Sequence, residues 1–305
     1  MDIEISEVGP RDGLQSISTI MTTDDKCRWI SALAAAGLPE IEVGSFVPAK
    51  VLPQLADTAE LVKHARTIKN LKVAVLVPNF RGAQNALVAG AHKITIPLSV
   101  SETHSLKNVK RSHVQMMEEV RKIRALINER PLEQRPVLEG GLSTAFGCTI
   151  EGPISEDKVV SIAEQLMEAG CNEVGLSDTT GYGNPVQVKR LTRKIWTALG
   201  RDKLTGIHLH NTRGQGLANV LAAIEVGLTT VDASMGGIGG CPFAPGASGN
   251  IVTEDLVFLL ESMGLKTGVN FERLLEARRI LADALPDTEL YGFTPDAGLP
   301  KGLSI

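Results

Sequence analysis

Short apolar runs rich in β-branched residues alternate with amphipathic stretches along almost the whole chain. Such runs are typical of buried strands, whereas apolar residues that recur every three or four positions are typical of helices. The pattern predicts eight strands, which are Ile3–Val8, Glu40–Ser45, Leu71–Val77, Lys93–Leu98, Val137–Thr144, Glu173–Ser177, Gly206–His210 and Thr229–Ser234.

Helical patterns with start and stop signals separate these strands. Capping side chains, a proline in the first turn and a glycine just past the end mark such boundaries. The clearest examples are a helix capped by Thr23 and stopped by Gly37, one opened by Ser155 and closed at Gly170, and one opened by Asn184–Pro185 and closed at Gly200.

Four helix-to-strand joints have similar sequences, namely AAAGLPEIEV, LVAGAHKITI, MEAGCNEVGL and IEVGLTTVDA. In each, a glycine is expected to take the left-handed conformation that ends the helix, before the chain enters a buried strand. The joints form a weak internal repeat of one β/α unit.

Alternating strands and helices predict parallel strands with right-handed crossovers. Eight such units in roughly 250 residues are the number that closes a (β/α)8 TIM barrel. The alternative is an open doubly wound sheet, but no GxGxxG follows the first strand. We predict one domain, with the barrel over about residues 3–250, extra C-terminal helices over about 251–285 (patterns Val252–Met263 and Asn270–Ala284) and an irregular tail over 286–305.

The 31 basic and 35 acidic residues give a formal net charge of −4, which argues against binding to nucleic acid or an anionic membrane through bulk charge. No apolar run is long enough to span a bilayer, and the sequence does not open with an export signal. The four cysteines lack CxxC spacing. We therefore expect a cytoplasmic protein with reduced thiols, without a disulfide framework or a zinc–thiolate cluster.

In a TIM barrel the reacting groups lie at the carboxyl ends of the strands. His208 and His210 are two residues apart on the seventh strand and so share one face, either in the barrel mouth or toward the helices. Paired histidines of this kind commonly bind metal, although they can also be hydrogen-bonded core residues.

The first strand ends in a turn, made by Gly9, Pro10 and Gly13, that presents Arg11 and Asp12 at the same rim. Asp12 either stabilises its own turn or joins the two imidazoles. Two imidazoles, a carboxylate and an amide or water oxygen form a mixed nitrogen and oxygen site that suits Mg²⁺, Mn²⁺ or Zn²⁺.

Two more carboxylates end buried strands. Glu42 on the second strand needs a partner, and Arg11 on the adjacent strand is the natural one, in a structural or a catalytic ion pair. Asp178 at the end of the sixth strand is expected to orient Arg11 or a metal ligand, or else to be a turn residue.

A glycine-rich loop over residues 236–250 follows the eighth strand and contains Cys241 near its centre. Its small residues suit a lid that approaches a ligand closely. Cys241 is either a chemical group or an inert apolar filler. Asn250 either caps the next helix or reaches the metal. A cation, an arginine and a thiol together fit carbon–carbon bond cleavage beside a carbonyl.

The motifs EVGPRDGLQ, IEVGSFV, SDTTG, HLHNTRGQGLANVLAA and GGIGGCPFAPGASGNIVTEDLV follow one another in order. Over about residues 3–285 the chain resembles the 3-hydroxy-3-methylglutaryl-CoA (HMG-CoA) lyases, metal-dependent barrel enzymes related to Claisen-type synthases. The cysteine loop is the most specific part of the resemblance. The resemblance implies an enzyme that uses Mg²⁺ or Mn²⁺ to cleave an acyl-CoA to acetoacetate and acetyl-CoA. It also implies a role in leucine degradation and ketone body metabolism.

The resemblance also implies roles for individual residues. The implied metal ligands are Asp12, His208, His210 and Asn250; the implied catalytic residues are Arg11, Asp12, Glu42, Asp178, His208 and Cys241; the implied substrate-binding residues are Gln15, Ser45 and Ser143. Arg11 matches the arginine that stabilises the acetyl-CoA enolate, Asp12 or His208 would be the base, and Cys241 would protonate the enolate. A homodimer is the expected assembly.

Three positions depart from the family pattern. Glu139 and Gly141 stand where the family shows an arginine and a tyrosine, and Asn211 replaces an aspartate. These changes place an anion where a cation is expected at the barrel mouth and enlarge the pocket. They leave two alternatives open. The substrate is another branched hydroxyacyl-CoA, or the chain is an aldolase or synthase of the same group that acts on a 2-oxo acid. Lys107, Lys110 and Arg111 either meet the CoA phosphates or form a solvated loop.

Overall fold

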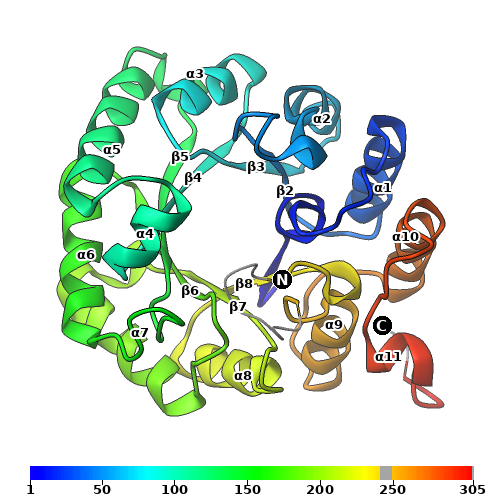
Figure 1. The fold of residues 1–305 in the computed structure, drawn as a ribbon. Coiled ribbons are helices and arrows are strands. Elements are labelled where there is room, and N and C mark those ends of the chain that lie inside the picture. The colour runs from blue at the N-terminus through cyan, green and yellow to red at the C-terminus, as the bar shows by residue number, and fades with distance from the viewer. Residues whose placement is uncertain (241–248, 304–305) are drawn as a thin grey trace.

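The computed structural model describes residues 1–240 and 249–303. Its eight strands form one closed barrel in which strands consecutive in the chain are neighbours, β1 pairs with β8, and every pair is parallel. Figure 1 looks along this barrel. The strands are β1 Glu4–Glu7, β2 Glu40–Ser45, β3 Lys72–Leu76, β4 Lys93–Ser99, β5 Val137–Ser143, β6 Glu173–Asp178, β7 Gly206–Leu209 and β8 Thr230–Ala233. The predicted TIM barrel is confirmed, and the open sheet is excluded.

Helices surround the barrel (Figure 1). They are α1 Thr23–Ala35, α2 Thr58–Ala65, α3 Phe80–Ala89, α4 Glu102–Asn108, α5 His113–Asn128, α6 Glu156–Ala169, α7 Pro185–Leu199, α8 Gly216–Val226, α9 Thr253–Ser262, α10 Phe271–Ala284 and α11 Phe293–Ala297. Across the described residues, none of these helices has the length and apolar character needed to cross a membrane.

The eighth helix of the barrel lies beyond the predicted barrel limit at residue 250. Helix α9 follows β8 and lies between α8 and α1 in the ring (Figure 1), so only α10 and α11 are additional. Helix α10 packs beside α1, where Asn270 N–H donates to the Ala36 carbonyl at 2.7 Å. The tail, expected to be irregular, contains the short helix α11.

Helix boundaries follow the predicted residues with two differences in capping, of which the first is that Ser155 precedes α6 without a capping hydrogen bond from its side chain. Asn184 caps α7 by accepting from the Gln187 N–H, as predicted. Helix α1 is capped by Thr22, whose side chain accepts from Asp25 N–H, so Thr23 is the first helical residue rather than the cap. Both threonines offer the same hydroxyl, and only the backbone angles distinguish them.

The four glycines at the repeated joints all adopt positive φ. The angles are 102° at Gly37, 88° at Gly90, 113° at Gly170 and 108° at Gly227. An added side chain would be strained at each of these positions. The weak sequence repeat therefore reflects one recurring backbone geometry.

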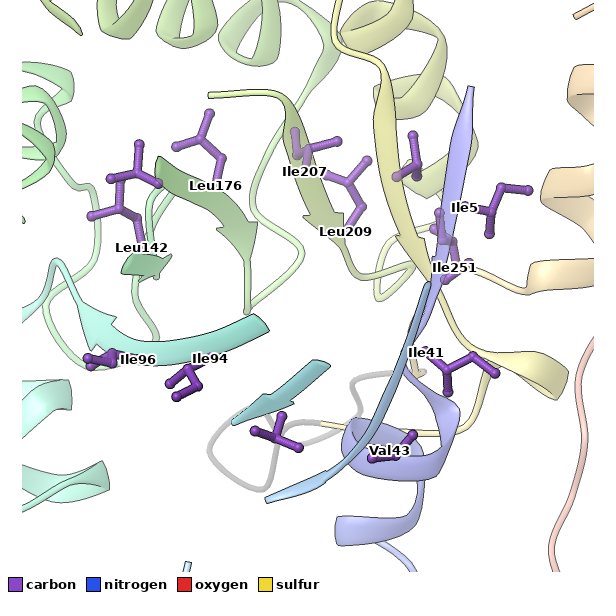
Figure 2. Packing of buried hydrophobic residues seen from close by; sticks show 14 of the residues in the cluster. Ile5, Ile41, Val43, Ile94, Ile96, Leu142, Leu176, Ile207, Leu209 and Ile251 are labelled. Carbon is purple, nitrogen blue, oxygen red and sulfur yellow. The ribbon is translucent and has the colours of Figure 1, made fainter. Parts of the chain in front are cut away.

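The two faces of each strand differ in chemistry. Isoleucine, leucine and valine side chains point away from the barrel axis toward the helices, as Figure 2 shows for Ile94, Ile96 and Leu142. The alternate residues point inward and include Lys93 and Glu139. The hydrophobic core thus lies between strands and helices, and the barrel interior is largely polar.

A charged cluster occupies the amino-terminal half of the barrel interior. The Lys93 Nζ lies 2.5 Å from Glu139, 3.1 Å from Glu173 and 3.7 Å from Glu40. Burial raises the pKa of Glu139 to about 7, although Lys93 opposes this. The sequence predicted that Glu139 is an anion at the barrel mouth, and this prediction is wrong. Glu139 is the third residue of β5 and is paired with Lys93.

We expect Lys93→Met to destabilise the fold by about 3–5 kcal/mol, because the half-buried Glu139 and Glu173 lose their cation and the buried Glu40 keeps only Lys72. Urea unfolding measures this change. Lys122→Met is the matched control, because Lys122 is 60% exposed and pairs only across one helical turn. A Lys93→Met protein as stable as the control variant would show that the cluster does not depend on this cation.

Candidate active site

The two histidines of β7 project together into the barrel mouth, the end formed by the carboxyl ends of the strands. Their Nε2 atoms lie 3.1 Å apart, and each lies 3.9 Å from Asp12 Oδ2. The His208 Nδ1 lies 3.1 Å from Asp232 Oδ2 on the neighbouring strand β8. Of the two orientations considered from the sequence, the inward one is found.

A π-helical turn over Gly9–Gly13 follows β1 and carries Arg11 and Asp12. Its geometry depends on Glu7, a fully buried residue. The Glu7 carboxyl accepts hydrogen bonds from Gly9 N–H and Met235 N–H, each at 2.9 Å, and from the Thr253 hydroxyl at 2.7 Å. Glu7 therefore joins the turn after β1 to the loop after β8 and the start of α9.

Arg11 is buried between two carboxylates. Its Nε donates to Glu42 Oε2 at 2.5 Å, and its Nη1 pairs with Asp12 Oδ1. Burial alone would lower the pKa of Arg11, but Glu42 and Asp12 raise it, so the guanidinium stays charged. The predicted Arg11–Glu42 pair is confirmed.

Asp12 is the common partner of the site. Its Oδ1 also accepts from the Gln15 amide at 2.9 Å, and its Oδ2 accepts from Asn250 Nδ2 at 2.8 Å. Burial acts to raise the pKa of Asp12, but Arg11 and the two histidines lower it to about 2. Asp12 is therefore an ionised carboxylate that faces both imidazoles.

Asn250 does not cap a helix, since α9 begins at Thr253 and Val252 is its N-cap. It instead forms a bridge with His210, and its Oδ1 is buried without a hydrogen-bond partner. The structure thus favours the second of the two sequence interpretations, in which the Asn250 amide oxygen is available to a ligand.

The donor set fits a divalent cation. Ligand atoms of Asp12, His208 and His210 lie within 4.8 Å of one another. Two neighbouring ligands of an octahedral ion with bonds of ~2.1 Å are roughly 3 Å apart, and the two Nε2 atoms are 3.1 Å apart. Together with the unpartnered Asn250 oxygen, these residues could hold a metal ion.

The other predicted site residues do not all contact the Arg11–Asp12 cluster. Asp178 accepts from Tyr182 N–H at 2.9 Å and Gly183 N–H at 3.0 Å, so its oxygens bind its own loop rather than Arg11. Burial raises the pKa of Asp178 to about 6. Ser143 lies at the end of β5, Ser45 is buried at the end of β2 with its hydroxyl accepting from Val47 N–H, and Cys241 lies outside the described residues.

Sequence reasoning missed Asp232 and Glu7. Asp232 is a single carboxylate on an otherwise apolar strand next to β7, which is the signal that identified Glu42 on β2. Glu7 immediately precedes the Arg11 turn, but its partners lie 228 and 246 residues away in sequence, at Met235 and Thr253. No local pattern indicates contacts of that separation.

Comparison with known proteins places this site in a family. A family model described as HMGL-like matches residues 2–281. Hydroxymethylglutaryl-CoA lyase YngG of Bacillus subtilis is 39% identical over 93% of this chain and 93% of its own length. The mitochondrial hydroxymethylglutaryl-CoA lyase of Mus musculus is 40% identical over 93% of this chain and 86% of its own length. The chain belongs to the HMGL-like family.

A solved HMG-CoA lyase from Acinetobacter baumannii, in complex with coenzyme A and 3-methylmalate, superposes on this HMGL-like chain with a TM-score of 0.91 and 40% identity. The match covers 99% of this chain and 97% of the other. The resemblance recognised from the motifs and the barrel fold are therefore both confirmed.

We expect the stability of the wild-type protein to fall as the pH rises through the neutral range, in part because of Glu7. Burial raises the pKa of Glu7 from 4.5 to about 8, so the folded state holds its proton more tightly than the unfolded state does. The stabilisation is complete below about pH 4.5 and is lost toward pH 8, by on the order of 2–4 kcal/mol.

Glu7→Gln, which preserves the shape but cannot ionise, should remove this component. Urea unfolding of both proteins from pH 5.5 to 8.5 tests it, with the exposed Glu272→Gln as the control. Parallel stability curves for the wild type and Glu7→Gln would mean that Glu7 does not bind the proton.

Proposed function

We propose that this chain is a divalent-metal-dependent carbon–carbon lyase that cleaves HMG-CoA to acetoacetate and acetyl-CoA. The observation that carries the proposal is that Asp12 is shared between Arg11 and the His208–His210 pair, in a chain about 40% identical to enzymes named HMG-CoA lyase. Nitrogen and oxygen ligands without a thiolate favour Mg²⁺ or Mn²⁺ as the cation.

The reaction is a retro-Claisen cleavage. A base removes the proton of the tertiary C3 hydroxyl, and the electron pair of that O–H bond forms the C=O bond of the acetoacetate ketone. The C2–C3 bond breaks, and its electron pair moves to C2 to give the enolate of acetyl-CoA. A proton delivered to C2 completes the product.

The residues divide this work by position. A cation bound by Asp12, His208, His210 and Asn250 would supply the positive charge that acidifies the C3 hydroxyl. Asp12 is the candidate base. His208, the other base predicted from the resemblance, has no free lone pair when Nε2 binds the cation and Nδ1 donates to Asp232. The Arg11 Nη2 makes no hydrogen bond within residues 1–240 and 249–303, so it remains available to the enolate oxygen. Cys241 is the proposed proton donor to C2.

The aldolase or synthase alternative is not favoured, because relatives about 40% identical to this chain are named HMG-CoA lyases. A different branched 3-hydroxyacyl-CoA is the second candidate. It stays open because Gly141 stands where the family shows a tyrosine, although a side chain added at Gly141 would already lie 3.2 Å from Thr95 Cγ2.

A cavity beside the barrel mouth supports a CoA ester as the substrate. It has a volume of about 740 Å³ and lies between α2, α3 and the loop after β2, where Ser45 and Phe46 line it. Three basic residues, Lys63, Arg81 and Arg111, line the same cavity together with one carboxylate, Glu119, which lies 4.0 Å from Arg111. Of the three basic residues considered for the CoA phosphates, Arg111 lines the cavity, whereas Lys107 and Lys110 do not.

Metabolic and cellular roles extend the proposal. We infer a part in leucine degradation and ketone body formation, since acetoacetate and acetyl-CoA are the products. Relatives 40% identical to this chain include a lyase named cytoplasmic and a lyase named mitochondrial. A cytoplasmic location and a homodimer stay predictions from the sequence.

The direct test is incubation of the purified protein with Mg²⁺ and HMG-CoA, followed by an acetoacetate assay. Arg11→Met should lower kcat by at least about 10²-fold, because the enolate oxygen loses its cation, while Mn²⁺ binding persists. Arg193→Met, on the outer face of α7, is the control. No acetoacetate from the wild type, with cleavage of a 4-hydroxy-2-oxo acid instead, would refute the proposal.

We expect Arg81→Glu/Arg111→Glu to raise KM for HMG-CoA at least about tenfold, because two phosphate-binding charges are reversed. The pantetheine thioester of the same acid lacks those phosphates, so its KM should not change. Lys69→Glu, which does not line the cavity, is the control. An equal effect on both thioesters would show that the cavity does not bind the nucleotide end of CoA.

A further inference from the structure

Asp232 is the carboxylate of the barrel mouth that the proposed reaction leaves without a role. It lies on β8 directly opposite His208 in the strand register, and its Oδ2 is 3.1 Å from His208 Nδ1. Its side chain is 30% exposed, compared with 13% for His208. The pair thus lies at the inner wall of the site, with Asp232 on the side away from His210.

The hydrogen bond to Asp232 determines which nitrogen of His208 carries the proton. An ionised carboxylate only accepts hydrogen bonds, so Nδ1 must be the donor. The lone pair of a neutral His208 is then on Nε2, which is the atom that faces His210 Nε2 at 3.1 Å and Asp12 Oδ2 at 3.9 Å. Asp232 therefore directs the ligand atom of His208 toward the other ligands.

Asp232 also contributes to the charge balance of the mouth. Arg11 is the cation that Asp12 and Glu42 share, and Asp232 adds a further carboxylate on the other side of His208. Asp232 therefore places negative charge next to a candidate ligand of the cation.

We propose that Asp232 is the positioning residue for the metal site, where it holds His208 in the Nδ1–H tautomer and adds negative charge beside this ligand of a divalent cation. The inference rests on the proposed metal-dependent function. It concerns cation binding before any substrate is present. Carboxylate partners of this kind raise the metal affinity of a histidine ligand by about 10–100-fold.

Two variants separate the two contributions. Asp232→Asn keeps an oxygen that accepts from Nδ1–H but removes the charge, whereas Asp232→Leu removes both. Glu173→Gln is the matched control, because Glu173 is an inward carboxylate on β6 that pairs with Lys93 and not with a histidine. Mn²⁺ binding without substrate, followed by electron paramagnetic resonance, is the main measurement.

We expect the Kd for Mn²⁺ to rise about 10–100-fold in Asp232→Leu, less in Asp232→Asn, and not in the control. Nitrogen-15 NMR of the histidines should show Nδ1–H at His208 in the wild type and Asp232→Asn, and a loss of that preference in Asp232→Leu. If Asp232 acted only on stability, the variants would have lower melting temperatures, but the His208 tautomer would be unchanged and the Mn²⁺ affinities of Asp232→Asn and Asp232→Leu would not differ in this order.

Mn²⁺ affinity within twofold of wild type in Asp232→Leu, with the His208 tautomer unchanged, would overturn the inference. If Asp232→Leu does not fold, unchanged affinity in Asp232→Asn would overturn its charge component. Failure of the proposed function gives a different result, namely a wild type that binds Mn²⁺ but forms no acetoacetate.

Discussion

The ion pairs of one buried arginine hold the mouth of this barrel together. Arg11 bridges Glu42 of β2 and Asp12 of its own turn. Both carboxylates depend on this guanidinium, because loss of Arg11 would leave Asp12 and Glu42 as unpaired charges in a low-dielectric site. Asp12 in turn contacts Asn250 and faces the β7 imidazoles. Through this one carboxylate, residues from both ends of the chain share an electrostatic centre.

The barrel interior provides charge rather than apolar packing. In many TIM barrels, layers of branched apolar side chains fill the space that Lys93, Glu139 and Glu173 occupy here. The apolar contacts that stabilise the fold lie outside the strands, between sheet and helices (Figure 2). The functional interior and the stabilising core are thus on opposite faces of the same strands.

An excess of acidic groups inside the barrel favours a cation at its mouth. Both the Lys93 cluster and the Arg11 cluster contain more carboxylates than cations. Burial raises the pKa of Glu139 and so removes part of this excess near the closed end of the barrel. At the mouth, Arg11 keeps Asp12 ionised, and the excess there is available to a bound ion.

The number of strands and most of their limits could be predicted because glycine and capping residues mark each β/α unit. The meeting of Arg11, Asp12 and the two histidines was also predictable, since all of them end strands of one closed barrel. The side chains that pair across neighbouring strands could not be predicted, because the alternation of apolar and polar residues identifies the two faces of a strand but not its register. For this reason Asp232 was missed, and Glu139 was interpreted as a free anion although Lys93 lies beside it.

The sequence left two roles open for Asn250, a helix cap and a metal ligand. The structure favours the second, because its amide contacts Asp12 and α9 has another N-cap. Helix α9 was placed outside the barrel, because nothing local distinguishes the eighth helix of a ring from an added one. This difference arises where the chain returns to its beginning, and only closure of the barrel defines that region.

Asp12 and Asn250 are 238 residues apart in sequence, yet they are hydrogen-bonded. During synthesis, a nascent chain on the ribosome therefore lacks one wall of the pocket until more than four-fifths of it has been made. A translation product that ends before residue 250 would keep Asp12 but lack the amide that contacts it.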